Sequence, residues 1–416
     1  MLQRLKITGF KSIQDVELRF PRLTVLFGPN AAGKSNVLDA VQTISRAGVE
    51  RTLSDALADP IRGYPVEAFA FPPGGLSSLL SLPEASFALE ADLRSGSDTY
   101  RYRVAVAIQT STGGLSVTDE YLTALNANGE PKGSAQIEKI AGGLIRIRRK
   151  SKAAHPRQEP VGLNHTVLSD QRLGSTEYLQ IEKCRRELTG WRVYYLDPRV
   201  AMRAAKPPAE VSDIGVTGED IAPFLYRLRD EHRKHFDAIK RTLRAIVPSV
   251  DDVDVDLDKR RGTLDVYIRQ DGTDFSSRIV SEGTLRVLAL CSIAVNPWGG
   301  SLIAFEEPEN GVHPRRLELI ARLLISLAMN KDRQVIVTTH SPLFCDAILR
   351  EAKTSNEDIA KEMALFNVRR IQGRTVAKRF EMPGPLFTDE KIAEALSAKS
   401  EDGLFEGLLL RGLLDE

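Results

Sequence analysis

Eight consecutive residues, Gly28-Pro-Asn-Ala-Ala-Gly-Lys-Ser35, constrain this chain more than any other part of its sequence. They match the pattern G-x-x-x-x-G-K-[ST], between an apolar, β-rich run (23–28) and a segment with apolar residues at helical spacing (35–47). Glycines in such a turn let backbone amides cradle phosphate oxygens, and the following helix adds its positive end. The motif therefore predicts a phosphate-binding loop, with Lys34 directed at the β- and γ-phosphates and the Ser35 hydroxyl at Mg²⁺.

Length and composition exclude several classes of protein. The 416 residues suffice for two or three domains, and 42% hydrophobic with 27% charged residues is ordinary for a globular chain. Because the net charge is only +1, nucleic-acid binding would need a local basic patch or an assembly. Three isolated cysteines favour free thiols over a disulfide framework or a zinc cluster. No apolar run is long enough to span a membrane and no signal peptide is visible, so we expect a cytoplasmic protein.

The apolar pattern predicts strands and helices in an order typical of α/β proteins. Strands are expected at 2–8, 16–20, 23–28, 87–93, 100–108, 191–198, 264–269, 301–308 and 334–342, those at 87–108 in an antiparallel sheet. Helices are expected at 35–47, 281–295 and 315–329, and the stretch 218–247 is either one long amphipathic helix or a broken pair. Stretches 60–83 and 148–172 are predicted as loops.

Two carboxylates and a histidine follow buried strands far downstream of the glycine loop. Glu306 and Glu307 end one strand, and adjacent strand residues point to opposite sides. Glu306 can therefore face Mg²⁺ while Glu307 faces the attacking water as a general base. His340 ends the run VIVTTH, where it could sense the γ-phosphate or polarise the water. The alternatives are a charged strand cap and a strand-end histidine with a structural role only.

The stretch Ser281-Glu-Gly283-Thr-Leu-Arg opens a predicted helix. A serine and a glycine at a helix N-terminus form a second anion site, although a plain N-cap serine is the simpler interpretation. Two phosphate-binding loops in one chain suggest one nucleotide held between two subunits. His313 either shapes a loop at a dimer seam or caps the helix that follows.

Four ordered motifs, GPNAAGKS, SEGTLR, AFEEPENGVHP and VIVTTHSP, with the opening LKITGFKSI, resemble the ABC-type ATPase heads of the SMC/RecF/OLD group. Within that group the chain is most similar to stand-alone bacterial AAA-family ATPases, several of which act in phage defence. The resemblance covers nearly the whole chain and implies ATP and Mg²⁺ as cofactors. The residues that it implies are Asn30, Gly33, Lys34, Ser35, Asn36, Ser281 and Gly283 for nucleotide, Ser35 and Glu306 for metal, Glu307 and His340 for catalysis, and Asn310 in a D-loop-like role.

The motif variants narrow the resemblance. SEGT replaces the transporter-like SGGQ and the first Walker B acid is Glu, both as in OLD-like proteins and unlike transporters. No coiled-coil arm is visible, and the residues after His340 carry no acidic DxD cluster of a Toprim domain. We therefore expect no nuclease activity from this chain alone; a separate Toprim-like or HNH nuclease would supply it. The metal-sensing glutamine has several candidates and is not placed.

The expected fold is an α/β P-loop NTPase, an ABC-type head with a mostly parallel sheet, a flanking antiparallel β region and a helical insertion. Along the chain we expect the start of the P-loop lobe at 1–110 and an inserted β/helical subdomain at 111–280. The signature, Walker B and switch-histidine part then covers 281–372, and 373–416 is a segment that packs on its own domain or docks a partner.

The expected function is a Mg²⁺-dependent ATPase that dimerises around ATP, or forms a higher homo-oligomer, and switches a partner effector, with no membrane partner. A DNA repair or maintenance ATPase and a nucleotide-bound scaffold with negligible turnover are the alternatives. Nucleic-acid binding stays open, because the basic run at 146–157 either contacts a phosphate backbone or is a solvated loop. The tail Glu390–Leu414 is apolar and either packs on its own domain or docks a partner.

Overall fold

The computed structural model describes residues 1–380 apart from 59, 152–154, 330–332, 356–358 and 360. The chain forms two compact units, and each unit is built from three separate segments of the sequence. The first comprises Met1–Pro21, Gly28–Trp191 and Phe366–Arg379, and the second comprises Arg22–Phe27, Arg192–Leu365 and the chain from Phe380. The predicted C-terminal tail lies outside the described residues.

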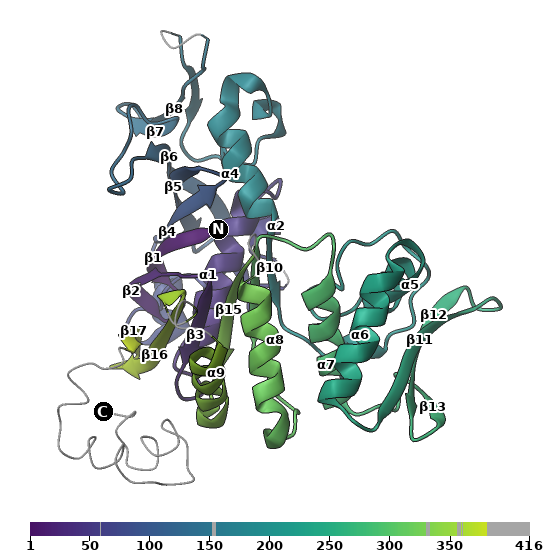
Figure 1. Ribbon diagram of the computed structural model, residues 1–416. Coiled ribbons are helices and arrows are strands. Elements are labelled where there is room, and N and C mark those ends of the chain that lie inside the picture. Colours follow the sequence, from purple (N-terminus) through teal and green to yellow (C-terminus); the bar gives the residue numbers. More distant parts are fainter. Residues whose placement is uncertain (59, 152–154, 330–332, 356–358, 360, 381–416) are drawn as a thin grey trace. The chain divides into compact units, whose positions relative to one another are not determined.

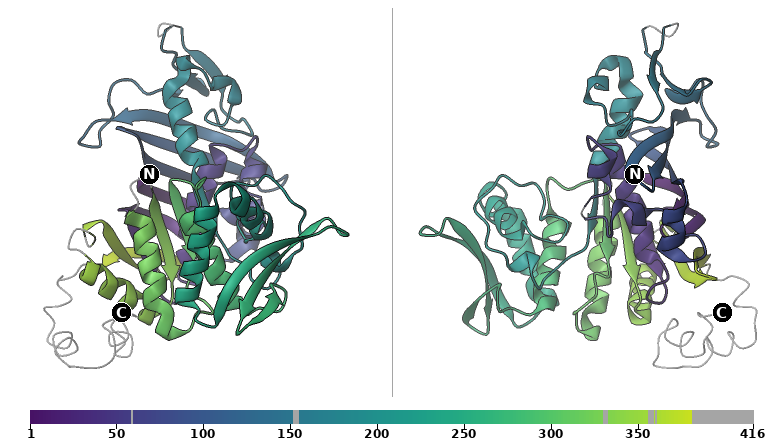
Figure 2. Two further views of the ribbon diagram at one scale, coloured as in Figure 1. Left: turned by 45° about the vertical axis from the view of Figure 1, so that its right-hand side comes forward. Right: turned by 180° about the vertical axis from the view of Figure 1, so that it is seen from behind.

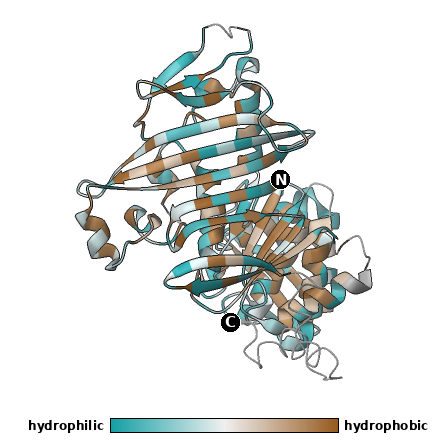
Figure 3. Cartoon of the chain, turned by 90° about the vertical axis from the view of Figure 1, so that its left-hand side faces the viewer, coloured by the Kyte–Doolittle hydropathy of each residue, from teal (hydrophilic) through white to brown (hydrophobic). Residues whose placement is uncertain are grey.

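An antiparallel sheet dominates the first unit, in the strand order β2-β1-β4-β5-β6-β7-β8-β9. Its strands are β1 (Leu2–Phe10), β2 (Ile13–Arg19), β4 (Glu84–Ser95), β5 (Asp98–Gln109), β6 (Gly114–Leu125), β7 (Ile137–Ile140), β8 (Leu144–Ile147) and β9 (Arg157–Pro160). Apolar and polar residues alternate along the long strands, as Figure 3 shows. The flanking antiparallel region expected from the sequence is confirmed.

Helices of the first unit pack near this sheet. They are α1 (Lys34–Ala47), α2 (Leu53–Ala56), α3 (Gly75–Ser81) and α4 (Leu179–Thr189), with short 3₁₀ turns at Pro65–Ala68, Gln171–Leu173 and Thr176–Tyr178. The helix predicted at 35–47 is confirmed. The prediction of loop over 60–83 was wrong in part, because α3 forms there although it buries only Leu79. So short a helix has too little periodicity to be visible in sequence.

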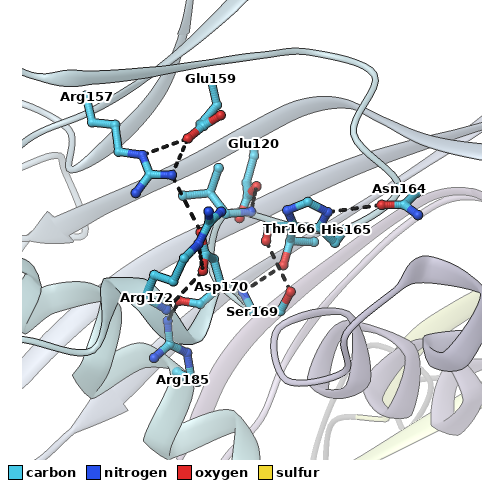
Figure 4. A network of polar contacts seen from close by, with 11 residues as sticks. Glu120, Arg157, Glu159, Asn164, His165, Thr166, Ser169, Asp170, Arg172 and Arg185 are labelled. Atoms are coloured by element: carbon cyan, nitrogen blue, oxygen red, sulfur yellow. Dashed lines mark hydrogen bonds and ion pairs between the residues drawn. The ribbon is translucent and has the colours of Figure 1, made fainter.

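A buried carboxylate, Glu120 of β6, holds the loop that follows β9 (Figure 4). It accepts hydrogen bonds from the backbone N–H groups of Val167 (2.6 Å) and Leu168 (2.9 Å) and from the Tyr102 hydroxyl (3.1 Å). Burial raises the pKa of Glu120 to about 7. All of its partners lie in the first unit, so it ties the loop to the sheet.

A second sheet has six strands in the order β10-β14-β15-β3-β16-β17. They are β3 (Leu23–Phe27), β10 (Trp191–Tyr194), β14 (Leu302–Glu306), β15 (Gln334–Thr339), β16 (Met363–Ile371) and β17 (Arg374–Phe380). Strands β14, β15 and β3 are parallel. Their carboxyl ends meet at the same edge of the sheet, because Glu306 pairs with Thr338 and Thr339 pairs with Phe27. Ligands of α/β proteins bind at this end of such strands.

The second unit also holds a three-stranded sheet of β11 (Val250–Asp258), β12 (Thr263–Gln270) and β13 (Thr273–Ser276), against which α5 (Ile221–Glu231) and α6 (Arg233–Ile246) pack (Figures 1 and 2). The predicted stretch 218–247 is therefore the broken pair, interrupted at His232. Helices α7 (Glu282–Val295), α8 (Leu317–Met329) and α9 (Pro342–Ser355) share one apolar core with these elements. Two short 3₁₀ turns lie at Ala201–Arg203 and Pro314–Arg316.

Candidate nucleotide-binding and hydrolytic site

The phosphate-binding loop predicted from the sequence runs from the end of β3 to the start of α1. Ala31 (φ +63°) and Gly33 (φ +101°) adopt left-handed backbone angles, which turn successive amides toward one side. A Cβ on Gly28 would lie 2.1 Å from the Val368 carbonyl oxygen, and one on Gly33 would lie 2.0 Å from the Thr375 hydroxyl. Both glycines are therefore required by close neighbours as well as by backbone conformation.

Lys34 folds back over this loop. Its ammonium donates to the carbonyl oxygens of Gly28 and Pro29, both at 2.9 Å, and the residue is only 5% exposed. The other side of the loop is braced by Thr375, whose hydroxyl contacts Ser12 at 2.6 Å and donates to the Ala32 carbonyl at 3.0 Å. An ammonium held above inward-turned amides suits the phosphates of a nucleotide.

Asn36, directly after the loop, lines a cavity of about 1040 Å³ in the first unit, to which no residue of Gly28–Ser35 contributes. Asn36 donates to the Ser12 hydroxyl at 2.6 Å, and Lys11, Arg62 and Phe71 also contribute to the wall. Among the described residues no group of three or more His, Cys, Asp or Glu could hold a metal by itself. Of the two magnesium ligands expected from the sequence, Ser35 belongs to the first unit and Glu306 to the second, and their joint role stays a prediction.

Glu307 follows β14 in the second unit with a strained backbone (φ +46°). Both of its carboxylate oxygens are held: Oε1 lies 2.8 Å from Nδ1 of His340, and Oε2 accepts from the Asn310 amide at 2.7 Å. Its N–H donates to the Thr338 carbonyl at 3.0 Å. The two predicted catalytic residues, Glu307 and His340, are thus in direct contact, an arrangement that could orient the base toward a water molecule.

Glu309 is a part of this region that sequence reasoning missed. It is 5% exposed, and its carboxylate accepts a hydrogen bond from the Thr339 hydroxyl. Burial raises the pKa of Glu309 to about 7. A glutamate in the turn sequence Glu-Asn-Gly is expected on the surface, so no signal in the sequence marks it as buried.

The predicted signature segment opens α7. The Ser281 hydroxyl accepts from the Thr284 N–H at 3.2 Å, so the N-cap role is present whatever further role this serine has. A Cβ on Gly283 would lie 2.1 Å from the Gly311 carbonyl oxygen, so the first turn of α7 touches the turn after Glu307. A cavity of about 390 Å³ in the second unit is lined by Leu196, Asp197, Pro198, Arg199, Glu282, Arg286, Asn310 and Gly311.

Contacts of the described residues bear on two further sequence alternatives. His313 caps the 3₁₀ turn at Pro314–Arg316 by accepting from the Arg315 N–H, as one of its two interpretations proposed. Within the basic run, Arg146 and Arg148 both contact Glu138, and Arg157 contacts Glu159. Arg146 and Arg148 share a single carboxylate, so both interpretations of the basic run stay open. Lys152 lies outside the described residues.

The comparisons with known proteins agree with this architecture. Residues 23–346 match the AAA_21 family, described as "AAA domain, putative AbiEii toxin, Type IV TA system". The DNA replication and repair protein RecF of Ligilactobacillus salivarius is 36% identical over 55 residues, which are 13% of this chain and 14% of that protein. The matched part therefore spans far less than two thirds of the relative.

Solved structures of SMC heads resemble this chain to different degrees. An SMC head bound to the C-terminal winged-helix domain of ScpA superposes with a TM-score of 0.52 at 14% identity, over 92% of this chain and 98% of that chain. An SMC head domain from Thermotoga maritima gives a TM-score of 0.41 at 15% identity, over 91% and 99%. The first likeness shows a P-loop ABC-type fold. None of the helices in the described part of the chain is long and apolar enough to cross a membrane.

Proposed function

Because the chain belongs to the AAA_21 family, within the SMC/RecF group of ATPases, we propose that it hydrolyses ATP with Mg²⁺ and that two copies enclose the nucleotide. The observation that carries this proposal is the contact of Glu307 with His340 at the level carboxyl ends of β14 and β15. This contact supports a role for Glu307 as general base with His340 as its polar partner, at the end of the sheet where α/β proteins bind ligands.

The first unit would hold the substrate. The Gly28–Ser35 loop, with left-handed backbone angles at Ala31 and Gly33, and the Lys34 ammonium suit the phosphates. Ser35 and Glu306 would hold Mg²⁺, which neutralises phosphate charge when bound. Asn30 and Asn36 belong to the same predicted set.

Glu307 would accept a proton from water as its oxygen attacks the γ-phosphorus. Hydrogen bonds from Asn310 and His340 fix the carboxylate, so little reorientation is needed before the proton moves. His340 would in turn respond to the γ-phosphate. The proton acceptor and its orienting partners all lie in the second unit.

The signature segment would face the nucleotide of a second copy. Ser281 is exposed at the N-terminus of α7, and Gly283 allows α7 to approach the turn after Glu307. We infer that ATP binding closes the dimer and that the closed state is read by a separate effector, in a defence role against phage. Direct DNA binding by the basic run at 146–157 stays the alternative.

The test is ATP turnover by the purified protein with Mg²⁺ and with excess chelator, beside Lys34→Ala. We expect Mg²⁺-dependent turnover that falls to background in the variant, since the loop loses its only lysine. Lys183→Ala is the matched control, because Lys183 forms a surface ion pair with Asp98 at 2.6 Å and should leave turnover unchanged. Equal turnover in Lys34→Ala and wild type would contradict the site assignment.

A further inference from the structure

Glu309 carries a buried carboxyl to which the hydrolytic step above assigns no role. It lies two residues after Glu307, in a turn closed by hydrogen bonds from Asn310 N–H to the Glu307 carbonyl (3.1 Å) and from Val312 N–H to the Glu309 carbonyl (3.0 Å). A carboxyl at 5% exposure is costly unless its oxygens find partners. The hydrogen-bond partners of Glu309 therefore indicate the role of this residue in the turn.

One partner connects Glu309 to the catalytic histidine. The Thr339 hydroxyl donates to Oε1 of Glu309 and accepts from the Ser341 N–H at 2.9 Å. A hydroxyl that donates on one side and accepts on the other is fixed in rotation. Because His340 lies between these two residues, Glu309 helps set the direction from which the imidazole meets Glu307 at 2.8 Å.

The other oxygen of Glu309 has an incomplete environment. Oε2 is buried and without a hydrogen-bond partner among the described residues, and the same holds for Nε of Arg286 on α7. Glu309 is the carboxylate that attracts the Arg286 guanidinium most strongly, while burial lowers the pKa of Arg286. In the described structure the two form no hydrogen bond and no ion pair. A buried carboxyl oxygen and a buried guanidinium nitrogen in this state each call for a partner, and each is of the type that the other needs.

The backbone offers a route by which α7 can affect this turn. Gly283 in the first turn of α7 abuts Gly311, where a Cβ would lie 2.1 Å from the carbonyl oxygen. Interfaces packed this closely transmit small displacements instead of absorbing them. A shift at the N-terminus of α7 therefore reaches the turn that carries Glu307 and Glu309.

We propose that Glu309 is a positioning residue of the hydrolytic centre, which holds Thr339 and thereby His340 against Glu307, and which pairs with Arg286 when the N-terminus of α7 engages a nucleotide. This rests on the proposed ATPase function. It gives the second copy's nucleotide a physical means of completing the arrangement around the base in this copy.

The first experiment compares steady-state ATP hydrolysis of Glu309→Gln, Thr339→Val and Thr339→Ser with wild type. Glu309→Gln and Thr339→Val should lower kcat about tenfold while KM for ATP stays within about twofold, because binding is left intact. Thr339→Ser keeps the hydroxyl and should stay within about twofold of wild type. Wild-type kcat in Glu309→Gln, or a loss that lies wholly in KM, would overturn the proposal.

A double-mutant cycle tests the pairing with Arg286. Arg286→Gln alone should lower kcat about tenfold, and its combination with Glu309→Gln should be no slower than the slower single variant. Independent effects, with a combined loss of about a hundredfold, would overturn the pairing. Arg286→Lys, which keeps the charge but not Nε, should recover part of the activity and serves if Arg286→Gln does not fold.

The matched control is Glu120→Gln, which removes a second buried carboxyl whose pKa is also about 7 (Figure 4). Its kcat per folded molecule should equal that of wild type. If Glu309→Gln and Glu120→Gln lose activity only in proportion to their folded fraction, Glu309 is structural and the proposal fails. Absence of turnover in wild type would instead refute the ATPase function itself, so the two failures are distinguishable.

Discussion

Two buried carboxyls, Glu120 in the first unit and Glu309 in the second, have the same raised pKa of about 7 for the same reason, burial. They differ in how completely they are hydrogen bonded. Glu120 accepts from two backbone N–H groups and a tyrosine hydroxyl, whereas Glu309 accepts from Thr339 and has one oxygen without a hydrogen-bond partner in the described part of the chain. A perturbed pKa therefore does not separate structural from functional carboxyls here.

The neighbours of each group complete the contrast. Glu120 joins strands to a loop, and its partners Tyr102, Val167 and Leu168 bring no proton-transfer chemistry. Glu309 lies among groups that do, since Thr339 precedes His340 and the turn begins at Glu307. A buried carboxyl whose hydrogen bonds are all made, such as Glu120, makes the fold more rigid. A buried carboxyl that lacks a hydrogen bond and lies beside a general base, such as Glu309, can gain a new partner during the reaction cycle.

The largest expected effect is the loss of ATP hydrolysis on substitution of Glu307, and it distinguishes the hydrolytic region of the second unit from the Glu120 network of the first. Glu307→Gln should still bind ATP, but its rate of ATP hydrolysis should fall about a hundredfold or more, because an amide does not accept the proton of water. It should also stabilise the nucleotide-bound dimer. Size-exclusion chromatography with and without ATP, beside hydrolysis assays, provides the measurement. Normal hydrolysis by this variant would remove Glu307 from the role of base.

The next effect concerns stability against pH. The folded-state pKa of Glu120, about 7, is above its ordinary value of 4.5, so the folded protein holds this proton more tightly than the unfolded chain does. Its stabilising contribution is therefore complete below pH 4.5 and is lost as pH rises through 7. The free energy of unfolding of wild type, relative to Glu120→Gln, should fall over that window by on the order of 3 kcal/mol.

Urea unfolding of both proteins at several pH values measures this difference. Parallel pH profiles for wild type and Glu120→Gln would show that Glu120 titrates normally in the folded state, which would break the likeness to Glu309.

The smallest effect tests whether the Glu120 network is purely structural. Tyr102→Phe removes one of the donors to Glu120 and should lower the free energy of unfolding by about 1 kcal/mol, the usual net value of a hydrogen bond. Turnover per folded molecule should not change. A lower kcat in this variant would mean that the first unit's network communicates with the hydrolytic site.

Much of the fold followed from sequence because its motifs sit on long, regular elements. The run LTVLFG, the glycine loop and the helix at 35–47 carry their own periodicity, and β3 and α1 match them closely. Elements that carry no motif were missed, whatever their length: helices α3, α4 and α9 and strands β16 and β17 were not foreseen. Strands such as β17 depend on a neighbour for their hydrogen bonds, which one sequence does not reveal.

The site shows the same division. Glu306, Glu307 and His340 were predicted because each ends an apolar run, and the contact of Glu307 with His340 agrees with their proposed roles without testing them. Ser12 and Thr375 brace the phosphate loop from 363 residues apart, and such pairing is created by tertiary packing alone. The four-part division of the chain stays a prediction, and the metal-sensing glutamine is still not placed.

The most direct test of the central claim, a nucleotide shared between two copies, is complementation in mixed dimers. Lys34→Ala lacks a working phosphate loop and Ser281→Arg lacks a working signature, so each alone should be inactive. After subunit exchange without nucleotide, about half of the dimers are mixed, and each of these has one intact site by symmetry, so about a quarter of wild-type turnover should return. Turnover by Ser281→Arg alone at the wild-type rate would contradict the shared site and leave Ser281 as a helix cap.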